Sequence, residues 1–103
     1  MKNELIEKQG SETQTTAMHG EPSLYFVMVH NDDFTPMEFV VGMLEKYFYM
    51  NRVKAIATML EAHAKGKAAC GTFPKDIAES KLAEVGKYAK VHEHPLTCSM
   101  EVV

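Results

Sequence analysis

The stretch that most restricts the fold is residues 24–39, where an apolar run leads through three polar residues into a helix start. The run LYFVMV is aromatic and β-branched and too short for an independent helix, so it predicts a strand. After Asn-Asp-Asp, Thr35 can act as N-cap, Pro36 suits the first helical position, and Glu38 completes a capping box with Thr35. We therefore expect a rigid bend that places two carboxylates and an amide at a strand end.

The remaining pattern predicts three helices and two further strands. Helices are expected over residues 35–49, 52–64 and 75–91, with Asn51 as N-cap and Gly66 as terminator of the second, and strands over residues 67–73 and 96–102. The residues expected to face inward are Phe39, Val40, Met43, Leu44, Tyr47 and Phe48 in the first helix, Val53, Ile56, Ala57, Leu60 and Ala64 in the second, and Ile77, Leu82, Val85, Tyr88 and Ala89 in the third. The order β-α-α-β-α-β, with helices amphipathic on one side, predicts an α+β fold in which three helices pack on one face of a three-stranded antiparallel sheet.

The chain divides into an arm and one domain. Residues 1–22 contain little apolar material apart from Leu5 and Ile6, so we expect a mobile N-terminal arm. Residues 23–103 are expected to form a single compact domain, because 103 residues do not accommodate two.

Charge and hydropathy exclude several classes of partner. The formal net charge is −3, of which −2 lies in residues 1–22, and from residue 23 onward nine basic residues face ten acidic ones. This balance provides no basic field for nucleic acid or an anionic membrane. No apolar run approaches the roughly 18 residues of a membrane span, and no secretory signal is apparent. We expect a cytoplasmic protein that binds neither nucleic acid nor membrane.

The two cysteines, Cys70 and Cys98, each lie in a strand-like apolar stretch. This placement is more typical of reduced core thiols than of a disulfide. Neither belongs to a C-x-x-C motif, and the tract from His92 to His94 cannot place three ligands on one helix face, so we expect no metal and no cofactor.

A candidate ligand site lies at the bend. The carboxylates of Asp32 and Asp33, beside the apolar Met37, suit a ligand with a positive end and an apolar end, such as the amino terminus of a peptide. His63, near the end of the second helix, has two readings. It either satisfies a backbone carbonyl at the helix end or lies opposite Asn31 and Asp32 around an ammonium group.

In the second reading, Met37, Met59 and Leu96 line an apolar cavity. Two hypotheses from other classes stay open. One is a small metal-binding or hydrolytic domain that uses His63, His92, His94 and a cysteine. The other is a protein-interaction module that uses Asp76 and Lys81 and has no peptide pocket.

Three separated motifs resemble one known family. Residues 29–39 (VHNDDFTPMEF), 59–71 (MLEAHAKGKAACG) and 94–100 (HPLTCSM) are similar, in this order, to the bacterial ClpS adaptors. The resemblance covers nearly all of residues 24–103, and the family also has an N-terminal arm.

The resemblance implies a monomeric, non-catalytic adaptor for N-degron proteolysis. Such adaptors bind proteins whose first residue is Leu, Phe, Tyr or Trp and deliver them to the unfoldase ClpA and its peptidase ClpP. Carried over to this chain, the α-amino group would be bound by Asn31, Asp32 and His63. The implied hydrophobic pocket comprises Asp33, at its rim, with Thr35, Met37, Met59, Ala62 and Leu96. The implied contacts with the N-terminal domain of ClpA are Asp76 and Lys81.

Three positions depart from the family pattern. Ala62 stands where valine is usual, which removes two methyl groups from the pocket wall. Asp76 stands where familiar members have glutamate, and Pro74 where a capping threonine is common. Met37 matches the family's gate against β-branched first residues.

Overall fold

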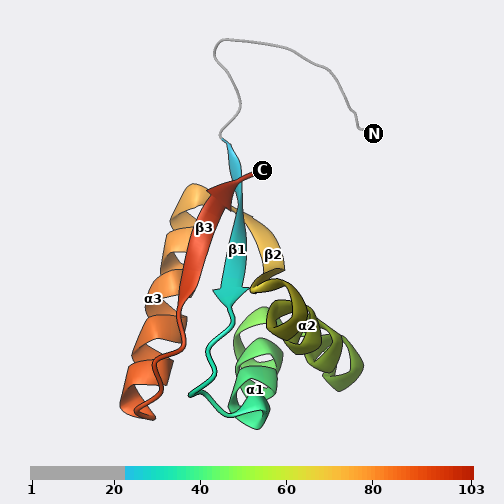
Figure 1. Ribbon diagram of the computed structural model, residues 1–103. Coiled ribbons are helices and arrows are strands. Elements are labelled where there is room, and N and C mark those ends of the chain that lie inside the picture. The colour runs from blue at the N-terminus through green and yellow to red at the C-terminus, as the bar shows by residue number, and fades with distance from the viewer. Residues whose placement is uncertain (1–22) are drawn as a thin grey trace.

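The computed structural model describes residues 23–103, and the arm predicted over residues 1–22 lies outside this part. The elements are β1 (Leu24–His30), α1 (Met37–Phe48), α2 (Arg52–Lys65), β2 (Lys67–Pro74), α3 (Lys75–Val91) and β3 (Cys98–Val102). The predicted α+β class and the order β-α-α-β-α-β are thus confirmed (Figure 1).

The sheet has the order β2-β1-β3, and β1 pairs antiparallel with both neighbours. Along β1, Val27 and Val29 are fully buried, whereas the alternate residues Phe26 and Met28 are half-buried. Since successive side chains of a strand point to opposite faces, this alternation means that the helices cover one face of the sheet. The covered face supplies the floor of the core.

The bend between β1 and α1 differs from the prediction. Helix α1 begins at Met37, two residues later than expected, and Pro36 occupies the N-cap position without a side-chain cap. Thr35 does not cap the helix, because its hydroxyl donates a hydrogen bond to Asp32 instead. Glu38 does not complete a capping box, because its carboxylate accepts two hydrogen bonds from Arg52 at the start of α2.

The ends of α2 follow the prediction. The side chain of Asn51 accepts a hydrogen bond from the backbone N–H of Lys54 at 2.8 Å. Gly66 ends the helix with φ of +93°, a left-handed conformation in which glycine avoids the steric cost of a Cβ. The loop from α1 to α2 is short, so the two helices pack as neighbours.

The predicted inward face of α2 is wrong. Five residues expected inside are exposed, namely Val53, Ile56, Ala57, Leu60 and Ala64. The buried residues are Ala55, Thr58, Met59 and Ala62. These are mainly small side chains, which let α2 approach β2 closely, where the facing residue Ala68 is also small and buried. In α3, Val85 and Ala89 are buried as expected, but Ile77 is exposed.

Cys70 and Cys98 are both free thiols. Cys98 pairs with Val29 in β1, and Cys70 lies in β2 at the register shift on the other side of β1. Neighbouring strands lie about 4.8 Å apart, so two residues with a whole strand between them are expected to exceed the roughly 7 Å Cα–Cα limit for a disulfide.

Candidate functional site

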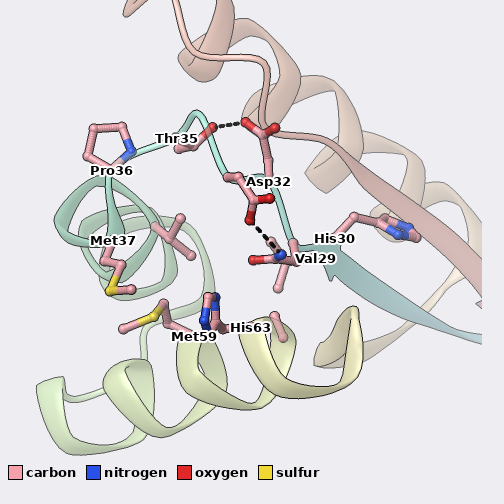
Figure 2. Close-up of a pocket in the computed structure, with 12 residues that line it drawn as sticks. Val29, His30, Asp32, Thr35, Pro36, Met37, Met59 and His63 are labelled. Atoms are coloured by element: carbon pink, nitrogen blue, oxygen red, sulfur yellow. Dashed lines mark hydrogen bonds between the residues drawn. The ribbon is translucent and has the colours of Figure 1, made fainter.

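A cavity of about 280 Å³ opens at the end of β1, between the loop that follows it, the start of α1 and the second half of α2 (Figure 2). Its lining residues are Val29, His30, Asn31, Asp32, Asp33, Thr35, Pro36, Met37, Val40, Met59, Ala62 and His63. The cavity is polar toward the strand end and apolar toward the two helices.

The polar end is held in place by short-range hydrogen bonds. The hydroxyl of Thr35, a buried residue, donates to one carboxylate oxygen of Asp32 at 2.5 Å. The side-chain amide of Asn31 donates to Asp33 at 3.2 Å. These bonds leave the carbonyl oxygen of the Asn31 amide and the second oxygen of Asp32 without a donor among residues 23–103. Both oxygens are therefore available to a ligand that donates hydrogen bonds.

One backbone contact brings the polar loop to α2. The N–H of Asn31 donates to the carbonyl of Gly66 at 2.9 Å, so the end of β1 is fixed to the end of α2. His63 lies three residues before Gly66, on the last turn of α2, and its ring stands at the cavity beside Met59 (Figure 2). Within the described residues, its ring has no hydrogen-bond partner. The arrangement thus places an imidazole, a carboxylate and an amide around one end of the cavity.

The apolar end has a buried wall and an exposed mouth. Val29, Val40, Met59 and Ala62 belong to the core and are at most 9% exposed. Met37, at the start of α1, is 53% exposed and lines the cavity together with Met59 of α2 (Figure 2). A thioether chain on an exposed position adapts its shape at little cost, so Met37 is suited to control access to the cavity.

Four lining residues were not among the predicted site residues, namely Val29, His30, Pro36 and Val40. Val40 was expected to face inward from its helical spacing, and Val29 belongs to the predicted strand. Both residues are part of the core cluster and of the cavity wall. His30 lines the cavity, but its Nε2 lies 2.6 Å from the hydroxyl of Ser99. Its ring is therefore directed toward β3 (Figure 2).

Three predicted site residues do not line the cavity. Leu96 was expected in the cavity lining, but it is buried in the core cluster that includes Met59 and Ala62. Asp76 is exposed on the first turn of α3. Lys81 has a side chain only 15% exposed, and its amine donates to the carbonyl of Tyr47 at the end of α1 at 2.8 Å.

Two general properties bear on other kinds of site. In residues 23–103, no three His, Cys, Asp or Glu side chains are grouped so that they could hold a metal ion. The hypothesis of a metal-binding domain built on His63, His92 and His94 thus has no ligand group in this part of the chain. None of the described helices combines the length and apolar character needed to cross a membrane.

The chain is similar to one known protein family over most of its length. Residues 20–99 match the family model described as "ATP-dependent Clp protease adaptor protein ClpS". A protein of Vibrio atlanticus named ATP-dependent Clp protease adapter protein ClpS is 45% identical over 101 residues, covering 98% of this chain and 90% of the relative. A protein of the same name from Hydrogenovibrio crunogenus is 51% identical over 82 residues, covering 80% and 79%.

A solved structure is also similar. It is described as Agrobacterium tumefaciens ClpS2 bound to L-phenylalaninamide, and it shares 37% identity and a TM-score of 0.78 with this chain. The match covers 81% of this chain and 100% of the other.

Proposed function

Since the chain belongs to the ClpS family of adaptor proteins of the ATP-dependent Clp protease, we propose that its cavity binds the free α-amino group and the bulky apolar first side chain of N-degron proteins. The expected first residues are Leu, Phe, Tyr and Trp. The family is non-catalytic, so the protein acts by recognition and delivery.

One observation carries this proposal, namely the division of a single cavity into a hydrogen-bond-accepting end and an apolar end. Asn31, Asp32 and His63 accept or balance the ammonium group at the first end. At the second end, Met37, Met59 and Ala62 surround the side chain, while Thr35 orients Asp32, Asp33 orients Asn31, and Leu96 supports the wall. The phenylalaninamide bound by the Agrobacterium protein has the same two parts, an α-amino group and a bulky apolar side chain.

The charge of the terminus accounts for selectivity against internal chain segments. A free α-amino group has a pKa near 8 and is mostly protonated at neutral pH, whereas a peptide nitrogen carries no charge. Each charge-assisted hydrogen bond contributes roughly 1.5 to 3 kcal/mol, and burial of a Leu or Phe side chain roughly as much again. After an association cost of at least about 4 kcal/mol, the expected Kd is near micromolar, weak enough for later release.

We assign to Met37, an exposed residue that lines the cavity, the role of a gate. β-Branched side chains carry two heavy atoms on Cβ and are therefore wide next to the backbone. The Met37 side chain at the mouth of the cavity would contact the second branch of Ile or Val and exclude it. Ala62, deeper in the wall, leaves additional room for the tip of a large ring.

Delivery requires a second surface. We assign the contact with the N-terminal domain of ClpA to Asp76 and Lys81 on α3, with the adaptor acting as a cytoplasmic monomer made of domain 23–103 and the arm 1–22. Asp76 is exposed and free to pair with a cation. The Lys81 amine has three donors, of which the Tyr47 carbonyl uses one, so a partner can accept from the others.

The test compares a Phe-initiated peptide with the same peptide N-acetylated, by fluorescence anisotropy. Acetylation removes the charge and leaves the side chain intact, so we expect binding of the free peptide near micromolar and no measurable binding of the acetylated one. Equal affinities for the two peptides would refute recognition of the ammonium group.

A further inference from the structure

Helix α2 carries an apolar stripe that the core does not use. Val53, Ile56 and Leu60, which we call the α2 shelf, lie at spacings of three and four residues and therefore share one side of the helix. They are 80%, 37% and 50% exposed, respectively. Among residues 23–103, packing covers Ile56 and Leu60 only in part and Val53 very little, and the hydrophobic core includes none of the three.

The α2 shelf continues the wall of the cavity. Ala62 is 4% exposed and Met59 is 9% exposed, both on the cavity side of α2. Ile56 lies three residues before Met59, and Leu60 lies three residues before His63, so both are neighbours of cavity residues on adjoining turns. Exposure rises steadily from Ala62 through Met59 and Ile56 to Leu60. The apolar wall thus leaves the cavity and extends over the surface of α2.

The geometry points to the α2 shelf as a binding surface for the side chains that follow the first residue of the substrate, an inference that rests on the proposed function. If His63 contacts the α-amino group, the Cα of the substrate's first residue also lies beside His63, because this Cα is bonded to the α-amino nitrogen. Each further residue advances the chain by about 3.8 Å between Cα atoms. Residues three apart on a helix, as Leu60 and His63 are, have Cβ atoms roughly 5–6 Å apart. The second and third residues of the substrate are therefore within reach of Leu60 and Ile56.

The substrate class follows from the chemistry of this surface. Aliphatic side chains gain free energy by covering other apolar groups and offer no hydrogen bonds to polar ones. This adaptor therefore prefers N-degron proteins whose second and third residues are apolar over those in which they are small and polar.

The experiment separates the two parts of the substrate. L-Phenylalaninamide contains only the first residue, so its affinity reports on the cavity alone. Competition assays would compare it with the peptides Phe-Leu-Leu-Gly-Gly-Ser and Phe-Ser-Ser-Gly-Gly-Ser. We expect the unmodified protein to prefer the Leu-Leu peptide by about five- to tenfold, which corresponds to partial burial of the two leucines.

The double variant Ile56→Gln/Leu60→Gln should reduce this preference to less than twofold and leave the affinity for phenylalaninamide unchanged. Ile77→Gln is the matched control, since Ile77 is 45% exposed on α3, and it should keep the full preference. A preference that survives in the double variant would overturn the inference, as would equal binding of both peptides by the unmodified protein.

Two further outcomes identify what else would have failed. If neither phenylalaninamide nor the two peptides bind, the proposed function is refuted, and so is the inference about the α2 shelf, which rests on it. If the double variant changes the sedimentation mass of the protein and not the peptide preference, the stripe serves self-association and the inference is wrong.

Discussion

At the scale of single residues, Asp32 both forms a hydrogen bond within the loop after β1 and lines the cavity. One of its oxygens accepts from Thr35, which fixes the carboxylate, and the other has no donor among residues 23–103. The sequence pattern predicted carboxylates at this bend but assigned the Thr35 hydroxyl to the helix N-terminus. Spacing alone does not decide between these two partners of the Thr35 hydroxyl. A carboxylate three residues before Thr35 and a backbone N–H three residues after it are both within reach. The hydroxyl donates to the carboxylate because a charged acceptor forms the stronger bond.

The first prediction concerns the charge of Asp32. Asp32→Asn keeps an oxygen that accepts from Thr35 but removes the charge that we propose balances the ammonium group. We expect a Phe-initiated peptide to bind about 10- to 150-fold more weakly, as follows from the loss of roughly 1.5 to 3 kcal/mol. The midpoint of thermal unfolding should stay within about 2 °C, because the hydrogen bond to Thr35 is retained.

The control is Asp76→Asn, the same change on α3 outside the cavity, which should leave peptide affinity unaltered. A large loss of stability in Asp32→Asn would show instead that the carboxylate is structural.

At the scale of elements, the number and order of the helices were predicted correctly, but the buried face of α2 was not. Helix α2 is apolar on two sides, with Val53, Ile56 and Leu60 on one and Met59 with small residues on the other. Hydropathy favours the side with larger aliphatic groups, whereas burial follows the side that packs closely on β2. A pattern of spacing cannot tell which apolar side a sheet will cover, because this depends on residues far away in the chain.

The second prediction concerns the end of α3. Glu93 has φ of +61°, and the N–H groups of Glu93 and His94 bond to the carbonyls of Lys90 and Ala89, which is the pattern of a Schellman motif. Glycine is the usual residue at this left-handed position because a Cβ is unfavourable there by about 1–2 kcal/mol. Glu93→Gly should therefore raise the free energy of unfolding by about 1 kcal/mol in urea titrations.

Glu79→Gly is a suitable comparison, since Glu79 is exposed in the interior of the same helix. There glycine should lower the free energy of unfolding by about 1 kcal/mol. If both variants change stability in the same direction, the conformation of Glu93 is not the cause.

The third prediction concerns the two strands that flank β1. Burial raises the pKa of the Cys98 thiol to about 12, and it raises the pKa of the Cys70 thiol as well. The unfolded chain releases these protons near pH 8.5, whereas the folded protein holds them to higher pH. The thiols therefore leave stability unchanged below about pH 8.5 and lower it as the pH rises toward 12, by up to about 1.4 kcal/mol per pH unit for each thiol.

Urea unfolding of the native chain and of Cys98→Ala at pH 7.5, 9 and 10 measures this effect. Lysine and tyrosine titrations are common to both proteins, so the difference in slope isolates the thiol. The variant should lose less stability between pH 9 and 10, and parallel curves for the two proteins would contradict the assignment.

At the scale of the whole molecule, the element order was predictable because each element has a local signal in composition, capping or periodicity. From the residues alone, only one part of the site was predictable, namely the part whose residues are close in sequence, at the bend after β1. The other part depends on contacts such as the hydrogen bond from Asn31 to Gly66, which join the end of β1 to the end of α2, so that His63 lines the same cavity as Asp32. Such a contact leaves no spacing in the sequence, and the family resemblance supplied it instead.

The last prediction separates recognition from delivery. All residues that line the cavity lie between Val29 and His63, so a chain that begins at Ser23 should fold and bind a Phe-initiated peptide with a Kd within twofold of the full chain. We expect the same truncation to abolish degradation of a Phe-initiated reporter by ClpA and ClpP, because the arm is expected to engage the unfoldase during handover. Undiminished degradation would refute a role of residues 1–22 in delivery, whereas weaker peptide binding would place part of the recognition surface in the arm.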